Sequence, residues 1–219
     1  MSLLIGTTPT RTFDDARRWV TEGTALLTGA IEGLDVAAFD DDSQLPGWTR
    51  KHLLGHVAAN ADALGNLISW AETGVEKRMY ASTEQRNADI KAAATRPADE
   101  LRAWYHRSAG ELEAAMGRLS AEQWEHEIIT AQLVTRKASD VPWMRARELF
   151  VHAVDLGVGI TFADLPDDFL LALADEIRTK RGLSDDDLRG VEGSLPDVAA
   201  WLAGRPHGLV AAPELGPWL

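Results

Sequence analysis

The chain has 219 residues, of which 45% are hydrophobic and 26% are charged. That length and composition are typical of a globular protein with one sizeable core. The formal net charge of −12 argues against a nucleic-acid partner, because phosphate binding needs clustered Lys and Arg. A small anionic substrate is compatible with this charge, since one buried Arg can bind it.

Two absences from the sequence narrow the class further. The chain has no cysteine, so thiol chemistry would have to use a thiol from outside the chain. No stretch approaches the roughly 20 apolar residues that span a bilayer. The opening "MSLLIGTTPTRTFDD" lacks the basic and long apolar regions of a signal peptide. We therefore expect a cytoplasmic protein that does not associate with membranes.

Helical periodicity is clear in the first third of the chain. Apolar residues recur at helical spacing over 14–31, and Gly33 follows as a stop signal. The stretch "DDDSQLPG" then predicts a loop. A second helix is predicted to begin near Thr49, which suits an N-cap, and to run to about Thr73.

The middle of the chain predicts two further long helices. A weaker helical segment over 83–94 leads into a helix over 97–119, and Pro142 opens another over 143–156. Between them, "HEIIT" and "AQLVT" are either short strands or extended connections. Four long amphipathic helices favour a four-helix bundle.

The tail has a different character. A helix is predicted within "DLPDDFLLALADEIRTKRG", and a short one within "SLPDVAAWLAGR". The final "PHGLVAAPELGPWL" contains three prolines, which prevent a long regular element. We interpret the residues after about 160 as a small C-terminal appendage.

Two polar residues interrupt the apolar stretch "RARELFVHAVDLG" of the fourth long helix. Glu148 and His152 are four residues apart, so they project from one helix face, with Asp155 about a turn further. A surface stripe, or a hydrogen bond that satisfies a core histidine, would explain the pair. A carboxylate and an imidazole at this spacing are also a metal motif of helical bundles.

The second long helix offers a third candidate ligand. In "HLLGHVAAN", His56 lies beside an apolar stripe and is expected to face the interior. His52 is nearer the helix start, where it could cap the helix or reach solvent. His56, Glu148 and His152 would leave at least one coordination position open, as in a catalytic zinc site. Spacing alone leaves this reading and the structural one open.

Two longer motifs indicate a family more specifically than the spacing of single residues does. "GWTRKHLLGHVAANADAL" and "VPWMRARELFVHAVDLGVGITFADLP" resemble the mycothiol-dependent maleylpyruvate isomerases, within the wider DinB-like metal-binding superfamily. The resemblance extends over most of the chain, through "MYASTEQRNADI" and "GSLPDVAAWLAGR". It implies a mainly α fold, with a DinB-like four-helix bundle over 1–160 and a small C-terminal α+β domain over 161–219. The segment before "GSLPDVAAWLAGR" is shorter than is usual in the family.

The resemblance also implies roles for individual residues. His56, Glu148 and His152 match the family's metal ligands, with zinc or another divalent cation as the metal, while His52 matches a non-ligand position. Arg205 matches a functional arginine that would bind a substrate carboxylate. Without the resemblance, Arg205 would be interpreted as a solvated cation at a helix end.

The activity that the resemblance implies is the cis–trans isomerisation of maleylpyruvate to fumarylpyruvate in gentisate breakdown. Rotation needs the double bond to become single, which the addition and later loss of a thiolate achieves. A free thiol has a pKa of about 8.5, and a metal would deprotonate it. Mycothiol, or another small thiol, would be the partner of the anionic substrate.

Other polar and aromatic residues have blander interpretations. His106 and His126 lie in charged contexts and are expected to be solvated, whereas His207 could line the site from its loop. Asp155 is either a partner that orients a ligand histidine or a polar group at a helix end. Three tryptophans near the motifs are expected in the core, with a pocket wall as the alternative: Trp48, Trp143 and Trp201.

Two other functions fit the same residues. One is a mycothiol or other small-thiol S-transferase of the superfamily, which would consume its thiol instead of regenerating it. The other is a metal-binding bundle without catalysis. The sequence does not indicate which thiol is used or what the oligomeric state is.

Overall fold

The computed structural model describes residues 11–216 and 218. These fall into two compact units: Phe13–Val158, called here the bundle unit, and Gly159–Leu219, called the C-terminal unit, which also includes Arg11 and Thr12. We propose that they correspond to the expected domains over 1–160 and 161–219. Most of "MSLLIGTTPTRTFDD", in which we found no signal-peptide pattern, lies outside the described residues.

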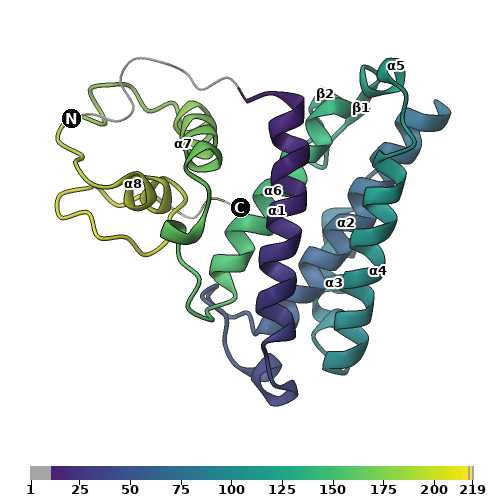
Figure 1. Cartoon of the computed structure of the whole chain (residues 1–219), viewed down its shortest axis with the longest axis horizontal. Coiled ribbons are helices and arrows are strands. Elements are labelled where there is room, and N and C mark those ends of the chain that lie inside the picture. Colours follow the sequence, from purple (N-terminus) through teal and green to yellow (C-terminus); the bar gives the residue numbers. More distant parts are fainter. Residues whose placement is uncertain (1–10, 217, 219) are drawn as a thin grey trace. The chain divides into compact units, whose positions relative to one another are not determined.

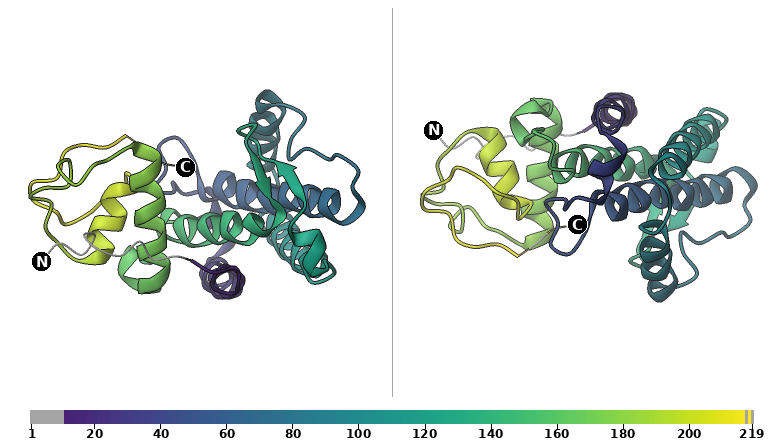
Figure 2. Two further views of the ribbon diagram at one scale, coloured as in Figure 1. Left: turned by 90° about the horizontal axis from the view of Figure 1, so that it is seen from above. Right: turned by 90° about the horizontal axis from the view of Figure 1, so that it is seen from below.

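Four long helices build the bundle unit (Figure 1): α1 (Phe13–Glu32), α2 (Arg50–Thr73), α4 (Ala98–Met116) and α6 (Val141–Asp155). Helix α1 packs on α6 and α2 packs on α4, while α2 also contacts α6. Figure 2 shows α1 end-on, with α2 and α6 side by side across the view. The predicted four-helix bundle is confirmed.

Helix α2 begins where the sequence predicts. The Thr49 N–H donates to His52 Nδ1 over 3.2 Å, and Thr49 Oγ1 lies 2.9 Å from the same nitrogen. At its other end the helix stops at Gly74, whose φ of 73° is left-handed and favours glycine. His52 therefore serves the start of the helix.

Shorter elements connect the long helices of the bundle unit: η1 (Val36–Asp40), α3 (Thr83–Ala93), α5 (Ala121–Trp124), β1 (Glu127–Ile129), β2 (Thr135–Lys137) and η2 (Ala138–Asp140). The strands form an antiparallel hairpin in which Ile128 faces Arg136. Within "HEIIT" the strand interpretation is confirmed, whereas β2 begins only at the last residue of "AQLVT".

Two glycines allow helices to approach closely. A Cβ at Gly23 of α1 would lie 3.0 Å from the Cβ of Leu149 on α6. A Cβ at Gly55 of α2 would lie only 2.4 Å from the Cβ of Ala93 on α3. The absent side chain at Gly55 lets α3 pack against the segment of α2 that carries His56.

The C-terminal unit contains η3 (Phe162–Asp164), α7 (Asp167–Arg181) and α8 (Leu195–Leu202). Helix α8 packs on α7 and on η3. We expected β-strand in this appendage, but its described residues are helical or irregular, and the strands lie in the bundle unit instead. The segment before α8 is polar, and the end of the chain after α8 is rich in proline. Proline lacks the N–H that strand pairing needs.

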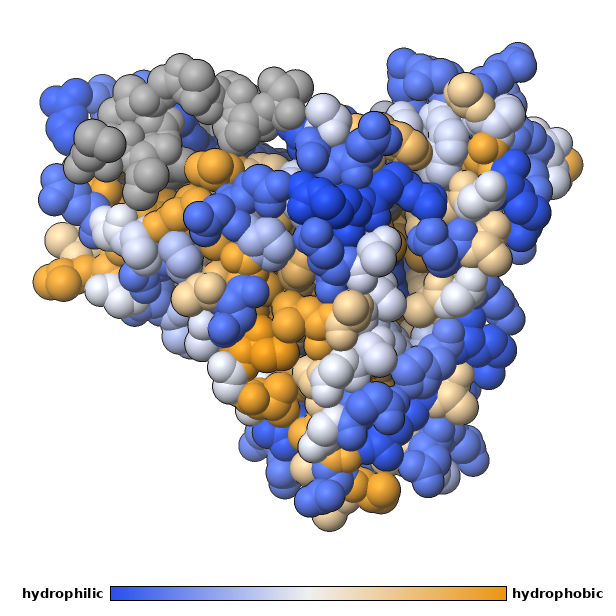
Figure 3. Space-filling model, in the orientation of Figure 1, coloured by the Kyte–Doolittle hydropathy of each residue, from blue (hydrophilic) through white to orange (hydrophobic). Residues whose placement is uncertain are grey.

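The surface of the bundle unit carries many hydrophilic residues, as the charged fraction of 26% suggests. Hydrophilic side chains predominate over its helices at the lower right of Figure 3. In the described part of the chain, no helix combines the length and the apolar character needed to cross a membrane.

Candidate metal centre

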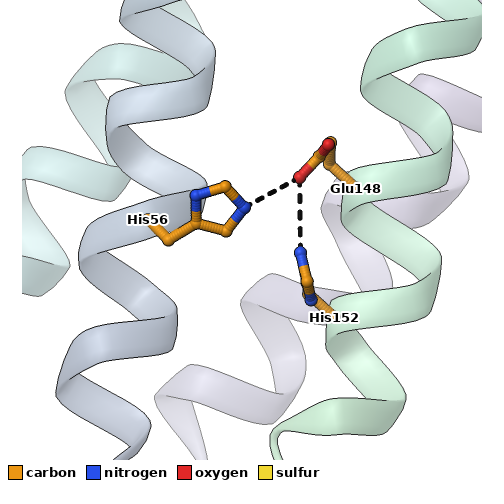
Figure 4. A group of neighbouring side chains, drawn as sticks. All are labelled: His56, Glu148 and His152. Carbon is orange, nitrogen blue, oxygen red and sulfur yellow. Dashed lines mark hydrogen bonds and ion pairs between the residues drawn. The ribbon is translucent and has the colours of Figure 1, made fainter. Parts of the chain in front are cut away.

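Three polar side chains from two helices converge inside the bundle unit (Figure 4): His56 from α2, with Glu148 and His152 from α6. His56 Nε2 lies 3.0 Å from Glu148 Oε2, and His152 Nε2 lies 3.3 Å from the same oxygen. The two imidazole rings are nearly perpendicular, at 84°. The structure therefore brings together the three residues that the sequence proposed.

Burial makes this cluster costly without a bound partner. His56 is 5% exposed and His152 is 3% exposed, whereas the Glu148 side chain keeps 14% of its surface. Buried polar groups require compensating interactions, and among the three side chains Glu148 keeps the most contact with solvent. A buried polar site with one accessible side is suited to a ligand that enters from solution.

Asp155 fixes the orientation of His152. Its Oδ2 lies 2.9 Å from His152 Nδ1, and the Asp155 side chain is fully buried. The Nδ1–H therefore donates to this carboxylate, which leaves Nε2 as the ring nitrogen that a metal could bind. Among the described residues, that buried Nε2 has no hydrogen-bond partner of acceptable geometry, although it lies within ion-pair distance of Glu148.

The pKa values follow from this geometry. Burial opposes protonation of His152, but the adjacent Asp155 and Glu148 carboxylates outweigh it and raise its pKa to about 9. Burial lowers the pKa of His56, with Glu148 acting in the opposite direction. Burial would raise the pKa of Glu148, but the two imidazoles hold it well below 4.5. Without a metal, a proton on His152 thus balances the Glu148 charge.

These residues fit a divalent metal. The three ligand atoms lie within 4.8 Å of one another, and His152 Nε2, 3.3 Å from Glu148 Oε2, points into the cluster. Tetrahedral ligands with bonds of about 2.0–2.1 Å stand ~3.3 Å apart, close to the two nitrogen–oxygen distances here. A donor set of two nitrogens and one oxygen leaves a position free for an external ligand.

Two arginines near the cluster were missed by sequence reasoning. Arg86 of α3 places Nη2 3.4 Å from His56 Nδ1. Arg145 of α6 is 1% exposed, and its Nη1 donates to Val57 O and Asn60 Oδ1 of α2 over 2.8 and 2.9 Å. Arg145 thereby ties together the two helices that carry the ligands. A charged residue in an apolar stretch was the available signal for Arg145.

Two of the three tryptophans, Trp143 and Trp48, lie in the bundle unit. Trp143 is buried and its ring lies 5.5 Å from that of Trp19, so it packs in the core. Trp48 is half-buried. Its ring and the His56 ring meet edge to face, with their centroids 5.6 Å apart. Trp48 therefore contacts the cluster through the His56 ring, and its role as a pocket wall stays a prediction.

The remaining histidines of the bundle unit lie outside the cluster. His106 is exposed and pairs with Glu32 over 2.7 Å. His126 is exposed, with its Nδ1 2.7 Å from Ala71 O. Both have the solvated surroundings that we expected.

Arg205 is buried in the C-terminal unit and is 7% exposed. Its Nη1 donates to Ala203 O over 2.8 Å and to Trp218 O over 2.7 Å. In the same unit Trp201 is a core residue, while His207 is exposed. A site role for Arg205 or His207 stays a prediction.

Together, fold and site define a four-helix bundle with two histidines and one carboxylate arranged to hold a metal. Residues 20–157 match the family described as "Mycothiol maleylpyruvate isomerase N-terminal domain". The chain belongs to this family of enzymes.

Solved structures agree with this assignment. The crystal structure of a mycothiol-dependent maleylpyruvate isomerase is 36% identical, with a TM-score of 0.89 over 98% of this chain and 100% of that one. A histidine-to-alanine variant of such an isomerase is 35% identical, with the same TM-score and coverage. None of the curated proteins compared with the chain matches it in sequence.

A third solved structure supports the fold alone. YfiT from Bacillus subtilis, described as a probable metal-dependent hydrolase with an unusual four-helix bundle topology, is 16% identical. Its TM-score is 0.55 over 67% of this chain and 86% of that one. The bundle is therefore shared more widely than the family's activity.

Proposed function

We propose that the protein is a thiol-dependent cis–trans isomerase that converts maleylpyruvate to fumarylpyruvate. The observation that carries the proposal is the convergence of His56, Glu148 and His152 in a chain of this family. Mycothiol, or another small thiol, is the co-substrate, and Zn²⁺ is the proposed metal because two imidazoles and one carboxylate are a common catalytic zinc set.

The ligand residues would hold the metal through His56 Nε2, Glu148 Oε2 and His152 Nε2. When bound, a divalent metal supplies a positive centre that favours the thiolate form of a thiol. Asp155 keeps the His152 proton on Nδ1, so that Nε2 stays available as a ligand. The ionised Glu148 reduces the charge that the metal brings into a buried site.

The chain's composition agrees with an external thiol. No cysteine is available to act as the nucleophile. A sulfur that adds to one alkene carbon leaves a single bond about which the molecule rotates, and loss of the same sulfur restores the alkene. The thiol is regenerated, which separates an isomerase from an S-transferase.

Arg205 is proposed to bind a carboxylate of the substrate. The planar guanidinium matches a carboxylate better than a point charge does. Arg205→Lys is therefore expected to lower activity on the order of 10²-fold without changing zinc content or the circular dichroism spectrum. Normal isomerisation by the Lys variant would show that Arg205 only forms hydrogen bonds to backbone carbonyls and does not bind the substrate.

The proposal is tested by incubating zinc-loaded protein with maleylpyruvate and a panel of thiols that includes mycothiol. We expect fumarylpyruvate to form while the thiol concentration stays constant. His56→Ala should lose this activity, while His106→Ala, which changes an exposed histidine outside the cluster, should keep it. Stoichiometric loss of thiol would indicate an S-transferase, and no turnover with any thiol would indicate a non-catalytic bundle.

A further inference from the structure

Arg86 approaches the metal centre from a different element than the ligands do. It lies on α3, which the close contact between Gly55 and Ala93 holds against α2. Its Nη2 is 3.4 Å from His56 Nδ1, the ring nitrogen that does not face Glu148. Arg86 itself is half-buried, so its guanidinium is shared between the site and solvent.

This contact is compatible only with the metal-free state of His56. A guanidinium only donates hydrogen bonds, so Nδ1 must accept and the ring proton must be on Nε2. When Nε2 ligates a metal, the proton of a neutral imidazole is on Nδ1. Two donors then face each other, and the guanidinium needs a new acceptor.

Arg86 has two other neighbours besides His56. Its guanidinium carbon lies 5.8 Å from the centroid of the Tyr80 ring, a cation–π distance. A long hydrogen bond of 3.4 Å also joins its Nη1 to Asn87 Oδ1. Burial and the Glu148 charge raise the pKa of Tyr80, while Arg86 opposes this, so these groups interact electrostatically.

We propose that Arg86 binds a carboxylate of the substrate beside the metal centre. The inference rests on the proposed function, in which the substrate carries a carboxylate at each end. A planar donor fork, released from an imidazole nitrogen and held beside Tyr80, is suited to a bidentate contact with a carboxylate.

The test uses maleate, a cis-dicarboxylate probe, and measures its binding to zinc-loaded protein by calorimetry. Arg86→Gln is expected to weaken maleate binding about 10- to 100-fold, which is the effect of losing a charge-assisted hydrogen bond. The maleate affinity of Arg86→Lys should lie between those of the unchanged protein and Arg86→Gln, because lysine keeps the charge but not the planar pair of donors. The uncharged diamide of maleic acid should bind equally to all three proteins.

The matched control is Arg78→Gln. Arg78 also stacks on an aromatic ring, that of Trp70, at 5.7 Å, but it is exposed and pairs with Glu76 over 2.5 Å. This variant should bind maleate like the unchanged protein. Zinc affinity is measured for every variant and should not fall in Arg86→Gln, because the hydrogen bond that this variant loses belongs to the metal-free state.

Two results would overturn the inference. One is unchanged maleate binding in Arg86→Gln, and the other is a parallel loss of zinc affinity, which would make Arg86 a support for His56. Because maleate binding does not depend on turnover, a failed isomerase assay with an intact Arg86 effect would reject only the proposed function.

Discussion

Asp155 Oδ2 lies 2.9 Å from His152 Nδ1 within the last turn of α6, and the Asp155 side chain is fully buried. Since the two residues share one helix, their spacing is fixed by helical geometry and not by a flexible loop. The carboxylate therefore keeps a proton on His152 Nδ1, so that Nε2 is the nitrogen available to a metal.

Asp155→Asn is expected to weaken zinc binding about 10- to 100-fold, as loss of such an outer partner usually does. Competition with a chromophoric chelator measures the affinity, and circular dichroism checks that the helices remain. The control is Asp99→Asn, at a carboxylate whose side chain is 82% exposed. Equal zinc affinity in the Asp155 variant would show that the metal alone orients His152.

The pH dependence of zinc binding follows from the raised pKa of His152, which is about 9 without metal. Zinc must displace this proton, so affinity should increase as pH rises toward 9, with about one proton released per ion near pH 7. Calorimetry in buffers of different ionisation enthalpy counts the protons. Proton-free binding at pH 7 would contradict the assignment.

The stability of the metal-free protein has its own pH dependence. The pKa of His152 is raised from 6.5 to about 9 on folding, so its contribution is complete below pH 6.5 and is lost as pH rises through 9. The pKa of Glu148 is lowered from 4.5, so its contribution is present above pH 4.5 and is lost in acid. The free energy of unfolding, measured in urea across this pH range, should fall both in acid and as pH rises through 9.

Gly55 and Gly65 offer a matched pair of substitutions in α2. Gly55→Ala would bring a Cβ within 2.4 Å of the Ala93 Cβ, whereas nothing lies within 4 Å of a Cβ at Gly65. Gly55→Ala should lower the free energy of unfolding by about 1–3 kcal/mol. Gly65→Ala should raise it by up to about 1 kcal/mol through helix propensity. Urea unfolding measures both, and a stabilising Gly55→Ala would contradict the close packing of α3.

The sequence predicted the long helices from apolar periodicity, and it predicted that Glu148 and His152 lie together because they are four residues apart in one helix. Thr49 is a typical residue for a helix start. Glu148 and His152 are four residues apart, so they lie on the same face of any helix that contains them. The choice of His56 over His52 needed the family motif, since both lie in the same helix. In the structure His52 serves the helix start.

The arginines could not be assigned from spacing. Arg145 and Arg147 lie two residues apart in one apolar stretch, yet Arg145 binds Asn60 while Arg147 lies 5.8 Å from the Trp143 ring. Their environments are set by the packing of α6 on its neighbours. The position of Arg86 depends on where α3 docks, which a contact between Gly55 and Ala93 determines.

The metal assignment is tested most directly by a crystal structure of the zinc-loaded protein with diffraction data collected at the zinc absorption edge. We expect one anomalous peak bounded by His56 Nε2, Glu148 Oε2 and His152 Nε2, about 2.0–2.1 Å from each nitrogen. The same crystals of His56→Ala should lose the peak but keep the bundle. A peak on other residues, or His56 facing away from Glu148 in zinc-loaded crystals, would contradict the account.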